Sequence, residues 1–267
     1  MTDEERSEMS IWSHLDELRK VLFKIGIVVV SAAVVLFIFM PWLFDNIIMA
    51  PARPNFPLYR LFDMLQIPGT ADGSDIPFSI SLINTELSAQ LFTHMSLSGY
   101  IALVVTFPIV IYLLWTFISP ALYENEKRNA TTAFLFGNVM FYIGVAVGYF
   151  LVFPLTLRFL ATYQLSELIS NTFTLDSYMD NFTGICLIMG AVFELPLVAW
   201  VMGRMGILHR SFFNKYRRHA IVALLILAAL ITPTGDPFTL LVVFLPLYAL
   251  WEFSAFIVPK DTPAAED

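Results

Sequence analysis

The stretch MSLSGYIALVVTFPIVIYLLWTFISPALY, residues 95–123, decides the fold class because it carries no charged side chain. A short charged segment follows it, and then residues 129–157 are again free of charge. Uninterrupted apolar segments of about 20 residues are typical of helices that cross a membrane. These two segments therefore predict an integral membrane protein.

Four further apolar segments extend the pattern in both directions. They are residues 24–42, residues 181–203 with the single charge of Glu194, and the two short stretches 220–231 and 238–251. Pro41 is expected to end the first span, and Pro154 lies near the expected end of the third. The break Thr232-Pro-Thr-Gly-Asp-Pro237 makes one continuous helix implausible and indicates a tight hairpin. We therefore predict an all-α integral membrane protein with six transmembrane helices. The last two are short, because 12 to 14 residues cover only ~20 Å of a hydrocarbon core that is ~30 Å thick.

The composition excludes several classes of protein. Hydrophobic residues make up 58% of the chain and charged residues 14%, against about 25% charged residues in soluble domains. The net charge of −7 without a basic run argues against nucleic acid. The single Cys186 offers no disulfide or metal framework. Since there is also no phosphate-binding loop and no complete catalytic triad, we expect no enzyme activity and no cofactor.

The remaining segments connect the predicted spans within a single membrane domain, residues 1–267. Helical periodicity in residues 10–20 predicts a short amphipathic helix. The prolines of residues 51–85 predict a loop outside the membrane. The other segments are an acidic mobile tail (1–9), a compact charged loop (124–128), a polar loop (158–180) and a C-terminal tail (259–267).

The distribution of basic residues predicts the orientation. With six spans, 12 Lys and Arg residues lie on the side of the two termini and 3 lie on the other side, which accounts for all 15. Cytoplasmic segments are enriched in basic residues. Both termini and residues 10–20 are thus expected in the cytoplasm, and residues 51–85 in the periplasm.

Two carboxylates near the predicted cytoplasmic surface are candidates for ligand binding. Glu17 lies with Arg19 at the foot of the first span, and Glu126 lies in the short loop between the second and third spans. One interpretation is an ordinary solvated helix face. The other is an acidic docking site for a cationic ligand, because a guanidinium binds a carboxylate through two charge-assisted hydrogen bonds.

Two acidic residues have other predicted roles. Glu194 lies near the middle of the fourth span, close to Pro196, where an ionisable group is usually functional but can also be a neutral structural one. Asp236 precedes Pro237 and is expected to cap the last helix.

Five short motifs follow one another along the predicted spans. They are His14-Leu-Asp-Glu-Leu-Arg19, Phe117-Ile-Ser-Pro-Ala-Leu-Tyr123, Glu126-Lys-Arg128, Phe193-Glu-Leu-Pro196, and Thr232-Pro233 with Asp236. In this order and at their predicted depths in the membrane, they resemble the TatC family of protein-export receptors across residues 10–258. Pro51 after the first span is also similar to a proline of the family.

The resemblance implies a function that composition cannot show. Proteins of this family recognise the twin-arginine signal peptides of folded cargo at the cytoplasmic face of the bacterial inner membrane. They work in an oligomeric complex with the single-span partners TatA and TatB, driven by the protonmotive force. The resemblance assigns signal-peptide binding to Glu17, Arg19, Phe117, Tyr123, Glu126, Lys127 and Arg128.

The chain departs from the family pattern in two places. The loop from residue 51 to residue 84 is longer than expected. The family often has Gln four residues after the hairpin aspartate, where this chain has Leu240, with Thr239 as the nearest polar residue. Thr239 and Leu240 are therefore the candidates for contact with a partner helix.

Two other functions remain open from the residues themselves. A proton-coupled transporter of small molecules would use Glu194 as its proton carrier, although no internal repeat of the kind found in transporters supports it. A membrane scaffold without a ligand would need neither glutamate.

Overall fold

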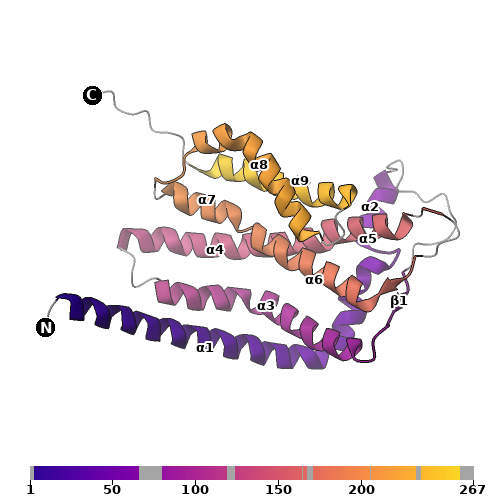
Figure 1. The fold of residues 1–267 in the computed structure, drawn as a ribbon, viewed down its shortest axis with the longest axis horizontal. Helices are drawn as coiled ribbons and strands as arrows, with labels where there is room; N and C mark the ends of the chain where they lie inside the picture. The colour runs from indigo at the N-terminus through magenta and orange to yellow at the C-terminus, as the bar shows by residue number, and fades with distance from the viewer. Residues whose placement is uncertain are drawn as a thin grey trace. The chain divides into compact units, whose positions relative to one another are not determined.

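The computed structural model describes residues 3–65, 80–118, 124–163, 165–166, 171–204, 206–232 and 236–258. Nearly all of this chain is helical (Figure 1), as the sequence predicts. It divides into two compact units, which are described separately. Unit 1 is Met1–Met40 with His94–Asn138, and unit 2 is Pro41–Thr93 with Val139–Asp267.

Unit 1 is built from three long helices, two of which continue into unit 2. They are α1 (Asp3–Leu43), α3 (Ala89–Ile118) and the first part of α4 (Glu124–Val147). Figure 1 shows α1 and α3 running in opposite directions. His94 on α3 joins them, since its ring stacks on Phe37 at 3.9 Å and its Nε2 lies 2.8 Å from the Phe37 carbonyl oxygen.

The helices of unit 1 are longer than the sequence indicates. Residues 10–20 belong to the same continuous helix as the first span, and that helix already includes residues from Asp3 onward. Residues 124–128 are the first turn of α4 and not a loop. The physical reason is that charged residues at a helix end are well solvated, so a change in polarity does not end the helix.

Helical structure also continues past two prolines, Pro41 and Pro154, at which the sequence predicts that a span ends. Pro41 lies inside α1, and the chain continues as a π-helical segment, η1 (Phe44–Ile48). The third span likewise continues past Pro154, through the π-helical η4 (Gly148–Val152) into α5 (Phe153–Thr162). A π-helical turn accommodates the local loss of a helical hydrogen bond, so a proline need not end the helix.

Unit 2 contains the remaining elements. The fourth span is divided into α6 (Leu175–Val192) and α7 (Leu195–Arg204). The last two helices are α8 (Arg210–Ile231) and α9 (Pro237–Ile257). The segment after η1 forms the 3₁₀ turn η2 (Ala50–Ala52), the short helix α2 (Pro57–Leu65) and strand β1 (Leu82–Ile83), which pairs in parallel with β2 (Phe173–Thr174).

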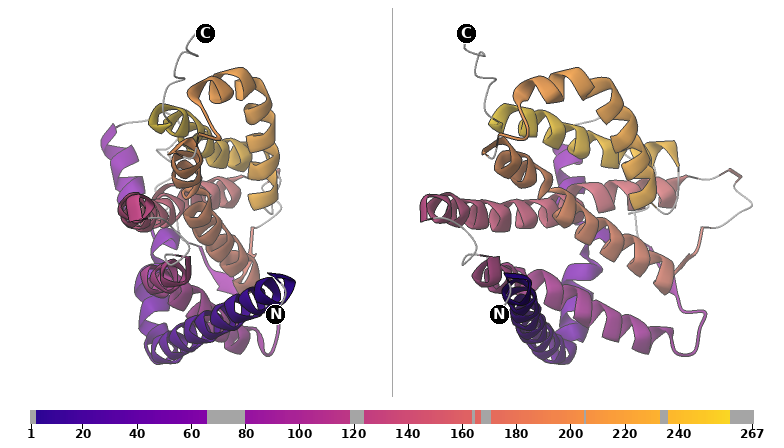
Figure 2. Two further views of the ribbon diagram at one scale, coloured as in Figure 1. Left: turned by 90° about the vertical axis from the view of Figure 1, so that its left-hand side faces the viewer. Right: turned by 60° about the vertical axis from the view of Figure 1, so that its left-hand side comes forward.

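The terminal hairpin packs closely within unit 2. Helices α8 and α9 lie side by side in Figures 1 and 2 and contact each other extensively. Phe213 of α8 packs on Trp251 of α9 at 4.8 Å, and Arg217 forms an ion pair of 2.7 Å with Glu252. Both helices extend beyond the apolar stretches of the sequence, to 22 and 21 residues.

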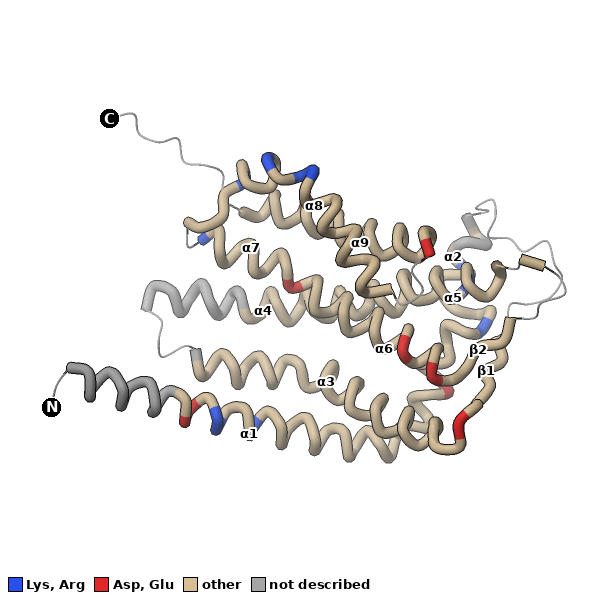
Figure 3. The backbone as a smooth tube through the Cα atoms, in the orientation of Figure 1, with Lys and Arg blue, Asp and Glu red and all other residues tan. Residues whose placement is uncertain are grey.

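Five segments of the described chain are long and apolar enough to cross a membrane. They are Leu15–Leu61, Ala89–Phe117, Phe134–Thr162, Leu175–Arg204 and Pro237–Ile257. The first half of α8 is basic, and α8 is not among them. Figure 3 shows long charge-free lengths of α1 and α3, with charges gathered toward the ends of the helices.

Three tyrosine hydroxyls, two of them on buried side chains, fix the backbone of η1 and η2 inside unit 2. Tyr178 donates to the Ile48 carbonyl at 2.6 Å, and Tyr149 donates to the Ile47 carbonyl at 2.7 Å. Tyr59 lies 2.9 Å from the Pro51 carbonyl and 3.2 Å from the Pro154 carbonyl. These bonds satisfy carbonyl groups that irregular turns leave without a helical partner, and an unpaired buried carbonyl is costly.

Two glycines allow α4 with η4 to approach α6 closely. A Cβ atom added at Gly144 would lie 2.5 Å from the Met189 carbonyl oxygen and 2.7 Å from Phe193 Cβ. One added at Gly148 would lie 3.1 Å from Cys186 Cα. Small residues four apart are typical of close helix packing in membranes.

Candidate functional site

The predicted acidic site begins on α1, where Glu17 and Arg19 are both exposed. The Arg19 guanidinium carbon lies 5.6 Å from the centre of the Phe23 ring, a cation–π contact along the helix. Glu17 forms no ion pair with any other residue that the structure describes. Its carboxylate is therefore accessible to a ligand.

The other residues of the predicted site lie at the α3–α4 connection. Phe117 is half-buried in the last turn of α3. The backbone of Glu126, Lys127 and Arg128 belongs to the beginning of α4. Their side chains, and the whole of Tyr123, lie outside the described residues.

Unit 1 brings the two parts of this site toward one end. Glu17 lies about 30 Å along α1 from the Phe37–His94 contact, and Phe117 lies about 35 Å along α3 from it. Since α1 and α3 run in opposite directions, both residues lie at the end away from that contact (Figure 1). The beginning of α4 is near the same end, because only residues 119–123 connect it to α3.

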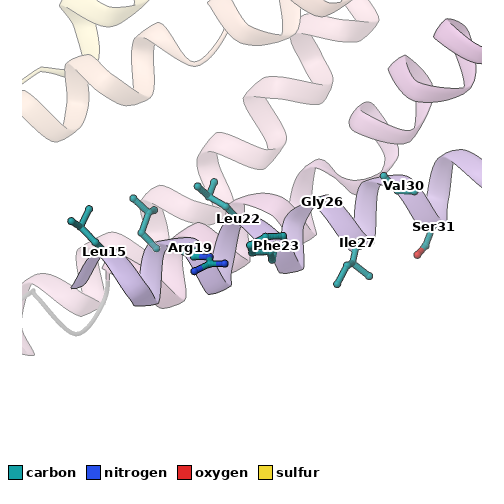
Figure 4. A pocket seen from close by; sticks show the side chains of 9 residues that line it. Leu15, Arg19, Leu22, Phe23, Gly26, Ile27, Val30 and Ser31 are labelled. Atoms are coloured by element: carbon teal, nitrogen blue, oxygen red, sulfur yellow. The ribbon is translucent and has the colours of Figure 1, made fainter. Parts of the chain in front are cut away.

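A shallow hollow follows Arg19 along α1. Figure 4 shows its lining in succession along the helix. Nearly all of the lining is apolar: Leu15, Leu18, Leu22, Phe23, Gly26, Ile27 and Val30, together with Arg19 and Ser31. The exposed Glu17 lies in the same turn of α1 as Leu15 and Leu18, where this apolar surface begins, but its side chain is not part of the lining.

Glu194 lies in the turn that separates α6 from α7. Its backbone N–H donates to the Ala191 carbonyl at 3.2 Å, and its carbonyl accepts from Val198 at 3.0 Å. The carboxylate is half-buried, and its Oε1 has no hydrogen-bond partner among the described residues. The structure therefore places this residue at a break in the helix, which the sequence did not predict.

Three candidate residues lie at the beginning of α9: Asp236 is its N-cap, and Thr239 and Leu240 are in its first turn. Asp236 Oδ1 accepts from the Thr239 backbone N–H at 2.7 Å, which confirms the predicted N-cap of α9. Thr239 is 1% exposed, whereas Leu240 is half-buried. Of these two, only Leu240 offers side-chain surface to a partner.

The packing residues that hold unit 2 together were not predicted from the sequence. The spacing Gly144-x-x-x-Gly148 could have predicted this packing, because small residues four apart are typical of membrane helices in close contact. The tyrosines that bind the carbonyls of η1 and η2 had no such signal. Their partners are distant in sequence, up to 130 residues for Tyr178 and Ile48.

The fold and the exposed charged residues define a polytopic α-helical membrane protein. Residues 13–246 match the family described as Sec-independent protein translocase protein (TatC). The chain belongs to the TatC family.

Individual relatives agree with this assignment. The TatC protein of Blattabacterium sp. subsp. Periplaneta americana is 32% identical, over 95% of this chain and 96% of the relative. That of Escherichia coli K12 is 29% identical, over 93% of this chain and 89% of the relative. A crystal structure of the twin-arginine translocase receptor TatC in DDM matches with a TM-score of 0.73 and 26% identity, covering 92% of this chain and 99% of that one.

Proposed function

We propose that this chain is the receptor subunit of a twin-arginine translocase. In this proposal it binds the twin-arginine signal peptides of folded proteins at the cytoplasmic face of the bacterial inner membrane. Single-span partners of the TatA and TatB type assemble with it in an oligomeric complex, and the protonmotive force drives export. The proposal includes six spans, and with six spans the distribution of Lys and Arg favours both termini in the cytoplasm.

Beyond membership of the family, one structural observation carries the proposal. The exposed Glu17 lies between Leu15 and Leu18, at the level of α1 where an apolar hollow begins that continues along the helix to Ser31. Signal peptides have a positively charged region followed by an apolar region of 7–15 residues. Along α1, an acidic residue is followed by an apolar surface. This order is complementary to a signal peptide, in which a positively charged region is followed by an apolar one.

The chemistry of the site favours arginine over lysine. A guanidinium is planar and can donate two parallel hydrogen bonds to one carboxylate, whereas an ammonium acts as a point charge. Glu17 and Glu126 are the proposed carboxylates. Arg19, Phe117, Tyr123, Lys127 and Arg128 shape the surface around them.

Charge reversal tests the proposal directly. Glu17→Lys and Glu126→Lys each lower the affinity for a labelled Arg-Arg signal peptide by about tenfold or more, because repulsion replaces a charge-assisted hydrogen bond. Fluorescence anisotropy with the detergent-solubilised protein measures this change. Replacing Arg-Arg by Lys-Lys in the peptide weakens binding to the unaltered protein.

The control is Glu86→Lys, which reverses an exposed carboxylate in unit 2. This variant keeps the affinity of the unaltered protein. If all three variants bind the peptide equally well, Glu17 and Glu126 belong to a solvated surface and the proposal is wrong.

A partner helix is proposed to contact the hairpin near Leu240. Thr239 is buried by its own chain, so it supports the cap region and does not form the contact surface. Crosslinking of a TatA- or TatB-type helix to position 240, and not to position 239, would support this assignment.

A further inference from the structure

A second hollow, of about 410 Å³, lies in unit 2 between α5, β2 and the beginning of α6. One side is apolar and includes Phe153, Leu157 and Leu160. The aromatic residues Phe173 and Tyr178 also line it, and the remaining lining residues are polar: Thr156, Asn171, Thr172, Ser177 and Asn181. The hollow therefore combines an apolar wall with hydrogen-bonding groups.

Two oxygens in this lining have no hydrogen-bond partner among the described residues. Thr156 is 2% exposed, and its Oγ1 is unpaired. Asn181 Nδ2 donates to the Ser177 carbonyl at 2.8 Å, which fixes the orientation of the amide and leaves Oδ1 as the unpaired acceptor. Buried polar atoms normally have a partner.

The other amide of the lining is already occupied. Asn171 Nδ2 lies 2.8 Å from the Tyr163 carbonyl and 3.3 Å from the Ala161 carbonyl. Among the buried side-chain oxygens of the lining, the unpaired ones are thus Thr156 Oγ1 and Asn181 Oδ1. A complementary ligand must supply at least one hydrogen-bond donor, because Asn181 Oδ1 can only accept.

The depth of the hollow points to a lipid. Thr156 lies about 9 Å along α5 from its end at Thr162, and Asn181 lies about 9 Å along α6 from its beginning at Leu175. Both helices belong to membrane-spanning segments that end nearby. The hollow therefore extends from the level of the headgroups into the outer part of the hydrocarbon layer.

From these observations we infer that the hollow binds a phospholipid whose headgroup carries hydrogen-bond donors. The ammonium of an ethanolamine headgroup and the hydroxyls of a glycerol headgroup both meet this requirement, whereas the methylated ammonium of choline does not. The headgroup donates a hydrogen bond to Asn181 Oδ1 and forms another with the Thr156 hydroxyl. The part of the acyl chains nearest the headgroup lies against Phe153, Leu157 and Leu160. The inference does not depend on the proposed function.

Native mass spectrometry of the purified full chain tests this site. The protein is incubated with phosphatidylethanolamine, phosphatidylglycerol or phosphatidylcholine that share the same acyl chains. The donor-bearing lipids are retained about fivefold more than phosphatidylcholine, as expected for one or two net hydrogen bonds. Thr156→Val and Asn181→Leu each reduce this preference to about twofold or less.

Two further variants make the result specific. Asn181→Asp raises retention of the ethanolamine lipid and lowers that of the anionic glycerol lipid, which distinguishes the two headgroups. Thr183→Val is the control, because Thr183 is a buried threonine of α6 whose hydroxyl donates to the Met179 carbonyl, and it does not line the hollow. It leaves the lipid preference unchanged, and thermal unfolding verifies that each variant is folded.

The inference is overturned if all three lipids are retained equally. It is also overturned if Thr156→Val and Asn181→Leu keep the preference of the unaltered protein, since the hollow then holds only water. Loss of a co-purifying single-span helix in these variants, with unchanged lipid preference, would assign the hollow to a protein partner instead.

Discussion

The first and fourth spans differ sharply in how the chain itself covers them. In the most apolar window of Leu15–Leu61, 6% of the residues are buried, whereas in that of Leu175–Arg204 the value is 44%. The first span carries two of the proposed receptor residues, Glu17 and Arg19, and the fourth packs against α4 and η4 through Gly144 and Gly148. The proposed ligand-binding residues and these close packing contacts therefore lie in different units.

The largest expected effect comes from adding one methyl group at the close contact in unit 2. Gly144→Ala destabilises the protein by about 1–3 kcal/mol or more, because the new Cβ would overlap the Met189 carbonyl and rigid neighbours cannot move away cheaply. Thermal unfolding in detergent measures the change.

Two control glycines, Gly184 in unit 2 and Gly26 in unit 1, test whether the cost of an added methyl group depends on close packing. Neither Gly184 on α6 nor Gly26 on α1 has any atom within 4 Å of an added Cβ. Gly184→Ala and Gly26→Ala leave stability unchanged or raise it by up to about 1 kcal/mol, because alanine favours helix. Equal destabilisation by all three changes would contradict the proposed difference in packing.

A similar or somewhat smaller effect is expected from removing one tyrosine hydroxyl. Tyr178→Phe leaves the Ile48 carbonyl buried without its donor and costs about 1–3 kcal/mol. Tyr112→Phe, at a tyrosine of α3 that is 55% exposed, changes stability by less than about 0.5 kcal/mol. Chemical denaturation distinguishes the two. If Tyr178→Phe is as stable as Tyr112→Phe, the tyrosine contacts do not hold η1 in place.

The smallest effect is expected from the ion pair between α8 and α9. Arg217→Gln costs about 0.2–1 kcal/mol, because the two side chains are 49% and 35% exposed and surface pairs contribute little. The cost decreases with added salt if the pair is solvated. A loss comparable to that of Gly144→Ala would show that the hairpin depends on this pair and not on its apolar contacts.

The sequence predicted the membrane class, most of the spans and the cap at Asp236, because these depend on local composition and spacing. It failed at helix ends. Residues 124–128 and Pro41 looked like boundaries by local rules, but the helix continues through both. The division of the fourth span at Glu194 and the tyrosine contacts to η1 depend on contacts between distant residues. A single sequence does not specify such contacts.

Of the candidate site, the sequence identified the residue types but not their surroundings. Glu17 and Arg19 were recognisable from their position before a span. The hollow that continues from Arg19 along α1 is evident only in the three-dimensional structure. Thr156 and Asn181 gave no signal at all, since a polar residue near a helix end is ordinary until its partners are known.

The central claim is that unit 1 carries the receptor site, and site-specific photo-crosslinking in native membranes tests it most directly. A photo-reactive amino acid replaces Asn125, beside Glu126, and signal peptides with Arg-Arg or Lys-Lys are added. We predict a crosslink that requires Arg-Arg and disappears in the Glu126→Lys variant. A crosslink that is indifferent to both changes, or no crosslink with either peptide, would contradict the claim.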